Sequence, residues 1–139
     1  MPSFGRNSRD RLSQCDHKLQ EVFNEVIKHI DCSVLEGIRS KEKQDRMFAE
    51  GKSKFKYPGS KHNVTTANGK SIAVDVAPYD PRVPGGIPWE DRERLTLFAG
   101  FVIGIAEGMD IKIRWGGDWD MDWEVNDNKF DDFPHFELR

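Results

Sequence analysis

In the stretch SKHNVTTANGKSIAVDVAP, from Ser60 to Pro78, a polar loop leads into a half-buried strand, and this strand indicates the kind of sheet to expect. In the strand, branched apolar residues alternate with two alanines and Asp75, so the branched side chains face one way and Asp75 the other. An unpaired carboxylate between apolar neighbours is costly, and a cation is its natural partner. We therefore expect a sheet that includes residues 71–79, with Asp75 paired to a cation.

Apolar periodicity predicts the elements on both sides of this strand. Helices and strands follow in mixed order, with connections too short for regular crossovers. This order favours an α+β fold, a small antiparallel sheet backed by helices, in one domain over residues 1–139. The expected elements are a helix at 9–30 capped by Asn7 or Ser8, a strand at 32–38, a helix at 41–51, a loop at 52–70 with a turn at Asn68-Gly69, the strand at 71–79, a helix at 89–107, a strand at 111–115 and a last strand at 134–139.

The composition is that of an ordinary globular domain, with 37% hydrophobic and 32% charged residues. No apolar run reaches the roughly 20 residues that cross a bilayer, so we expect no membrane insertion. The N-terminus lacks the apolar core of a signal peptide, which predicts a chain that starts in the cytoplasm. Cys15 and Cys32 are expected to be buried, reduced thiols, because their number and spacing do not suit a disulfide framework.

Charge is distributed unevenly within a net charge of −3, with a basic first half and an acidic second half. The basic residues between positions 39 and 61 either attract an anionic polymer or form a solvated face. They are not interleaved with aromatic residues, so the pattern does not support a nucleic-acid partner.

Two histidines and two aspartates have the residue types of a catalytic zinc site, which needs three protein ligands and one open position. His135 alternates with apolar neighbours as Asp75 does, so the two side chains share one face if their strands are adjacent. His62, in the loop before, can complete a set of three ligands, and Asp132 lies three residues before His135. The spacing alone leaves open a metal site or separate structural roles.

Four segments resemble motifs of the L-alanyl-D-glutamate and D-Ala-D-Ala peptidases, in the family's order. Ser60 to Pro78 is similar to the SKHxxxxAxDxAP signature, and DFPHFEL at 132–138 resembles the closing motif with an acid, a His and x-Glu. GIRSKEKQ at 37–44 is similar to GxRxxxxQ, and RWGGDW at 114–119 resembles a tryptophan loop. The resemblance spans nearly the whole chain, implies a hedgehog/D-Ala-D-Ala peptidase-like fold, and is strongest for single-domain phage endolysins.

The resemblance implies roles for individual positions. His62, Asp75 and His135 correspond to zinc ligands, and Asp132 to the catalytic acid/base carboxylate. Arg39 is expected to stabilise the developing oxyanion. The remaining implied positions are two substrate contacts, Gln44 and Ser60. The chain departs from the pattern between His62 and Asp75, where TTANGK at 65–70 is extra and is expected to form a hairpin beside the site.

The family also implies the substrate and the cellular route. We expect a peptidoglycan hydrolase, a phage endolysin that cuts the L-Ala–D-Glu bond of the stem peptide, acts as a monomer and reaches the wall from the host cytoplasm through a holin. One alternative is a D-Ala-D-Ala carboxypeptidase, and another is a non-catalytic wall- or peptide-binding module with structural zinc. Structural zinc sites usually have four ligands, so three ligands and Asp132 favour an enzyme.

The acidic loop before the last strand offers hard oxygen ligands, from Asp118, Asp120 and Asp122 at alternate positions. Such ligands suit calcium, and a calcium-responsive enzyme is one interpretation. The match to an EF-hand loop is poor, because Trp123 stands where the turn glycine belongs. The pattern therefore favours a solvated acidic loop, with calcium binding as the alternative. Tryptophans 115, 119 and 123 either line a substrate groove or pack beneath this loop.

Overall fold

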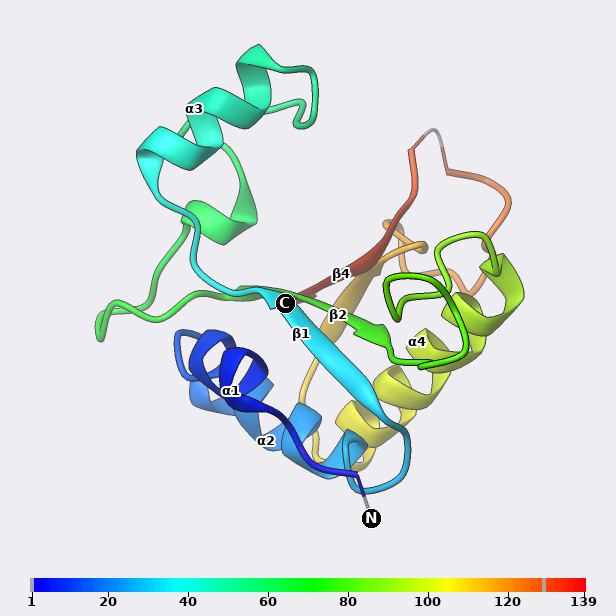
Figure 1. The fold of residues 1–139 in the computed structure, drawn as a ribbon. Helices are drawn as coiled ribbons and strands as arrows, with labels where there is room; N and C mark the ends of the chain where they lie inside the picture. The colour runs from blue at the N-terminus through cyan, green and yellow to red at the C-terminus, as the bar shows by residue number, and fades with distance from the viewer. Residues whose placement is uncertain (1, 129) are drawn as a thin grey trace.

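The computed structural model describes residues 2–128 and 130–139 and contains one four-stranded sheet with the order β1-β2-β4-β3 (Figure 1). Every neighbouring pair of strands is antiparallel. The strands are β1 (Cys32–Glu36), β2 (Ala73–Pro78), β3 (Ile113–Gly116) and β4 (Asp132–Leu138). The α+β class expected from the sequence is confirmed, and the two central strands are the ones that carry Asp75 and His135.

The helices divide into a group that covers the sheet and one helix that stands apart, as Figure 1 shows. The covering helices are α1 (Arg6–Leu12), α2 (His17–Val26) and α4 (Arg92–Gly108), whereas α3 (Lys41–Ala49) is set away from them with the loop that follows it. A short 3-10 turn, η1 (Lys61–Asn63), precedes β2. None of the helices in the described ranges has the length and apolarity needed to span a membrane.

The core lies between the sheet and the helices α2 and α4. Phe136 of β4 packs edge-on against Phe23 of α2, with ring centroids 5.5 Å apart, and against Phe98 of α4 at 6.3 Å. Val74 and Val76 of β2 are fully buried on the same face. Each such side chain contributes about 1.5–3 kcal/mol through burial, so the apolar half of the β2 alternation fixes which face is left for polar residues.

The expected single helix at 9–30 is wrong, because the chain breaks at residues 13–16 into α1 and α2. Asp16 caps α2 by accepting a hydrogen bond from Lys18 N at 2.9 Å. Its own backbone N–H donates to Ser71 O at 2.8 Å, and Ser71 N donates to Gln14 O. These long-range bonds compete with the helical ones. The first helix begins after Gly5, without a side-chain cap from Asn7 or Ser8.

The other elements match their predictions apart from their ends. Helix α4 begins at Arg92, three residues later than expected, because Asp91 caps it by accepting from Arg94 N. The turn predicted at Asn68-Gly69 is confirmed, with Gly69 at a φ of +74°. The inserted hairpin around it is closed by a Thr66 N–Lys70 O bond of 2.8 Å, and Lys70 Nζ donates to Ser13 O. The hairpin therefore packs on the α1–α2 junction.

Candidate metal centre and catalytic cleft

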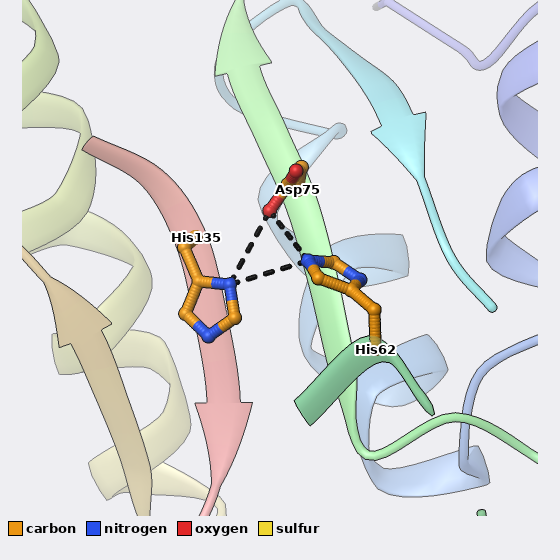
Figure 2. A group of neighbouring side chains, drawn as sticks. All are labelled: His62, Asp75 and His135. Carbon is orange, nitrogen blue, oxygen red and sulfur yellow. Dashed lines mark hydrogen bonds and ion pairs between the residues drawn. The ribbon is translucent and has the colours of Figure 1, made fainter. Parts of the chain in front are cut away.

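Asp75 and His135 are paired residues on β2 and β4, so their side chains leave the sheet on the same face. His62 approaches them from η1, and all three point to one centre (Figure 2). His62 Nε2 lies 3.1 Å from Asp75 Oδ1 and 3.2 Å from His135 Nδ1. The third separation, His135 Nδ1 to Asp75 Oδ1, is 3.5 Å. One nitrogen from each histidine and one carboxylate oxygen are thus close enough to share an ion.

The outer nitrogens of both histidines have acceptor partners, and this sets the tautomers. His62 Nδ1 lies 2.8 Å from Gly37 O, and His135 Nε2 lies 2.9 Å from Glu137 Oε1. If each outer nitrogen donates its N–H, the inner nitrogens present lone pairs to each other and to Asp75. Two lone pairs and a carboxylate converging in a buried place call for a cation. Hydrogen-bonded outer nitrogens are also the usual support of metal-bound histidines, so the residues fit a divalent metal.

The pKa values of the centre show the same demand for positive charge. Burial favours the neutral form of His135, but hydrogen bonds with Asp75 and Glu137 outweigh it and raise the pKa of His135 to about 9. Burial would raise the pKa of Asp75, but hydrogen bonds from His135 and His62 hold that pKa well below its usual value. A proton on His135 thus occupies the place of a cation, and a metal would displace it on binding.

Glu137 links the centre to a second strand. Its side chain is only 1% exposed and accepts from Arg114 Nη2 of β3 at 2.9 Å, while its other oxygen contacts His135. The sequence motif contained Glu137 without assigning it a role. The sequence feature that could have identified Glu137 is its position two residues after His135, which places both side chains on one face of β4.

A cleft of about 610 Å³ opens beside the centre. Asp132, at the start of β4, lines it, and its Oδ2 lies 3.9 Å from His135 Nδ1. Burial and the nearby charge of Asp75 raise the pKa of Asp132 above its usual value. A carboxylate that has a raised pKa and lies beside a candidate metal centre has the position and the proton affinity of a general base.

Arg39 and Ser60 also line the cleft, whereas Gln44 lies behind its wall. Gln44 is fully buried, and its side-chain oxygen accepts from Arg39 Nη1 at 2.9 Å. Ser60 Oγ caps η1 by accepting from His62 N. Of the three positions expected at the substrate, Arg39 and Ser60 reach the cleft, and Gln44 contacts it through Arg39.

The segments of the centre are joined by hydrogen bonds to main-chain carbonyl groups. Arg39 N donates to His62 O at 3.0 Å, and Asn63 Nδ2 donates to Arg39 O at 3.1 Å. Together with the bond from His62 to Gly37 O, these bonds hold the turn after β1 against η1. Arg39 and the candidate ligand His62 therefore form one hydrogen-bonded unit. No residue between 64 and 72 lines the cleft, so the inserted hairpin leaves the cleft mouth free.

The acidic loop between β3 and β4 brings three carboxylates together. One oxygen each of Asp118, Asp120 and Asp122 lies within 4.8 Å of the others. Asp118 is buried and accepts from the backbone N–H groups of Asp122 and Trp123 at 3.2 and 2.9 Å. Burial and the hydrogen bonds with the neighbouring carboxyl groups raise the pKa of Asp120. The loop thus concentrates negative charge.

The three tryptophans expected near the loop have separate places. Trp119 lines the cleft, with its ring centroid 5.4 Å from that of His135. Trp115 is buried and stacks on Phe133, and Trp123 is 67% exposed. Of these three tryptophans, only Trp119 contributes to the cleft wall.

Comparison with known proteins identifies the family. The family model for phage L-alanyl-D-glutamate peptidases matches residues 2–139. The chain is 28% identical over 126 residues to the L-alanyl-D-glutamate peptidase of Escherichia phage T5, covering 89% of this chain and 86% of that protein. It is similar to the crystal structure of the Serratia marcescens L-Ala D-Glu endopeptidase ChiX, with a TM-score of 0.73, 26% identity, and coverage of 99% and 91% of the two chains. Because the family model matches almost the whole chain, the chain belongs to the phage L-alanyl-D-glutamate peptidase family.

Proposed function

We propose that this peptidase is a zinc enzyme that hydrolyses the L-Ala–D-Glu bond of the peptidoglycan stem peptide, as an endolysin does. The observation that carries the proposal is the convergence of His62 Nε2, His135 Nδ1 and Asp75 Oδ1, with both outer histidine nitrogens already bound to acceptors. Two nitrogens and one carboxylate oxygen are ligands that zinc accepts, and three protein ligands leave room for water. The similarity to two proteins named for this bond supports its choice.

Asp132 is the residue we assign to proton transfer. When bound, zinc supplies polarisation of the scissile carbonyl and lowers the pKa of water to about 7. Asp132 accepts the water proton and later passes it to the leaving amine of D-Glu. Its raised pKa suits both steps, because a carboxylate of higher proton affinity removes a proton more readily. Trp119 borders the same part of the cleft and excludes bulk water from it.

Arg39 is the residue we assign to the developing negative charge on the carbonyl oxygen. It lines the cleft but is only 8% exposed, so its charge acts in a partly dehydrated setting where electrostatic effects are strong. An interaction that strengthens as charge develops lowers the barrier without tightening substrate binding. Ser60, at the same wall, is proposed to contact the substrate through its hydroxyl.

Mass spectrometry of digested peptidoglycan tests the bond assignment. Purified sacculi are incubated with the protein, with and without a chelator, and with zinc added back. We expect stem peptides that begin with D-Glu, loss of activity with chelator and recovery with zinc. Release of single D-Ala without detachment of stem peptides would replace this proposal with the carboxypeptidase alternative. Wall binding without any cleavage would favour the non-catalytic module.

Calcium binding by Asp118, Asp120 and Asp122 is a second proposal, supported by the closeness of their oxygens. Carboxylate oxygens are the ligands calcium prefers. Burial and hydrogen bonds with Asp122 and Asp118 raise the pKa of Asp120, and a bound calcium ion would favour its charged form. Titration calorimetry with calcium, on the wild type and on Asp120→Asn, tests this. We expect heat of binding for the wild type and a weaker response for the variant. Absence of binding at millimolar calcium would leave a solvated acidic loop.

A further inference from the structure

Glu36 lies on the same face of the sheet as the metal centre because of an irregularity in β1. Val34 pairs with Val76, but the next pair joins Glu36 with Asp75, so Leu35 is an extra residue on β1. With regular pairing, Leu35 would face Asp75, and Glu36 would turn to the face on which Val34 is buried. The bulge therefore brings a carboxylate beside Asp75 at a place where a leucine would otherwise stand.

A carboxylate next to Asp75 is unfavourable unless it is neutralised, and two cations neutralise it. Arg39 Nε donates to Glu36 Oε1 at 2.7 Å, and Lys43 Nζ lies 3.2 Å from the same oxygen. The side chains of Glu36 and Arg39 are 13% and 8% exposed, whereas Lys43 is 46% exposed. Because burying an ion pair costs desolvation energy, the Glu36–Arg39 pair is a poor way to gain stability. Its location beside the centre suggests a functional reason.

The other side of the Arg39 guanidinium is held by Gln44. Arg39 Nη1 donates to Gln44 Oε1 at 2.9 Å, and the Gln44 amide nitrogen donates to Ser53 Oγ at 2.8 Å and to Phe55 O at 2.6 Å. A guanidinium is planar, so contacts at Nε and Nη1 define the plane of the whole group. Among the residues that the structure describes, Nη2 makes no hydrogen bond, which leaves that nitrogen for a ligand in the cleft.

We propose that Glu36 is a positioning residue for the reaction, which holds the Arg39 guanidinium so that Nη2 is directed at the oxygen on which negative charge develops. The proposal rests on the proposed function, because it acts through the role given to Arg39. Gln44 supports the same geometry from inside the wall. A lysine at position 39, or an arginine exposed to solvent, would not need Glu36 and Gln44 to orient a planar charged group.

A double-mutant cycle separates positioning from a general effect on the fold. The variants are Glu36→Ala, Arg39→Ala and the combination, assayed on a soluble muropeptide that contains the L-Ala–D-Glu bond. We expect Glu36→Ala to lower kcat about 10- to 100-fold, since small displacements of a catalytic group have effects of this size, with KM changed less than about twofold. In the Arg39→Ala background the same change should have almost no further effect, because residues that act through one group are not additive.

The control is Lys43→Ala, which removes the exposed partner of Glu36 and should leave kcat near that of the wild type. Glu36→Gln, which keeps the shape of the side chain, covers the case in which Glu36→Ala fails to fold, and should lose less kcat. Binding of a phosphinic L-Ala–D-Glu isostere should weaken by the same factor as kcat, with metal content unchanged. The proposal would be overturned if the losses of kcat from the two substitutions multiplied in the double variant. It would also be overturned if Glu36→Ala lowered the thermal stability but kept a normal kcat. An inactive wild type would instead refute the proposed function.

Discussion

Asp75 and His135 stand directly opposite each other on β2 and β4, with Asp75 Oδ1 3.5 Å from His135 Nδ1. The strand pairing itself therefore brings together two of the three candidate metal ligands. Because side chains alternate along a strand, a slip of β4 by one residue against β2 would turn His135 to the core face and separate it from Asp75. The buried valines and Phe136 prevent such a slip, so packing of the core maintains the geometry of the centre.

Replacement of a single ligand should abolish metal binding. In His135→Ala, the centre keeps one nitrogen and one carboxylate, too few for a stable zinc site, so we expect substoichiometric zinc and no detectable hydrolysis. Zinc content after gel filtration, measured by atomic emission, checks this. His17→Ala removes a histidine that is 74% exposed and should keep full zinc content. One equivalent of zinc in His135→Ala would contradict the assignment of His135 as a ligand.

Replacement of Asp132 should separate metal binding from catalysis. Asp132→Asn keeps the size of the side chain but removes the proton acceptor, so we expect normal zinc content and kcat lower by about 10²- to 10⁴-fold. The neighbouring Asp131→Asn, which changes contacts with Arg92 and Asn128 away from the candidate centre, is the matched control. Unchanged turnover in Asp132→Asn would remove this residue from the mechanism.

The stability of the fold should depend on pH through Asp80. Hydrogen bonds from Arg82 and then Arg94, at 2.9 and 2.6 Å, hold the pKa of Asp80 well below its usual value. A carboxyl group with a lower pKa in the folded state stabilises it above the unfolded pKa of about 3.9, and this contribution is lost as the pH falls further. The free-energy difference between wild type and Asp80→Asn should therefore be largest near neutral pH and shrink in acid.

Urea unfolding across this pH range measures that difference. The exposed Asp110, whose φ of +59° asparagine also tolerates, provides the control Asp110→Asn, which should show little difference at any pH. A difference for Asp80→Asn that stays constant down to pH of about 2 would contradict the ion-pair explanation.

A methyl group at Gly37 should disturb the centre from outside. A Cβ there would lie 2.5 Å from Arg11 O and 3.0 Å from Gln14 Oε1, so the turn must shift. Because Gly37 O holds the outer nitrogen of His62, we expect Gly37→Ala to lose about 1–3 kcal/mol of stability and about tenfold in zinc affinity. Chelator competition and thermal unfolding measure the two effects. Gly100→Ala, on the open face of α4, should be neutral or stabilising.

Alternation around Asp75 and His135 predicted their strands and placed the two side chains on one face if the strands are adjacent. Their assignment as metal ligands, like that of His62, came from the resemblance to the peptidase family and not from the alternation. The break between α1 and α2 was not predictable in this way, because the apolar stripe through Leu12, Cys15 and Leu19 continues across it. The break coincides with the Asp16 cap of α2 and with backbone hydrogen bonds to Ser71, which is distant in the sequence.

The surroundings of Arg39 could not be predicted, because they depend on strand irregularity and on burial. A bulge changes which residues share a face, and nothing in CSVLE at 32–36 marks Leu35 as the extra residue. The complete burial of Gln44 likewise follows from the path of the loop after α3. A motif identifies Gln44 as important without saying whether it contacts a ligand or another side chain.

The hairpin at 65–70 offers a place to modify this enzyme. Its tip at Asn68-Gly69 is exposed, its base is held by the bond from Lys70 to Ser13, and it stays outside the cleft wall. Exposed loop tips accept inserted sequence most readily. A peptide that recognises a chosen bacterial surface can be grafted there, so that cell targeting is redesigned while the hydrolytic machinery keeps its arrangement.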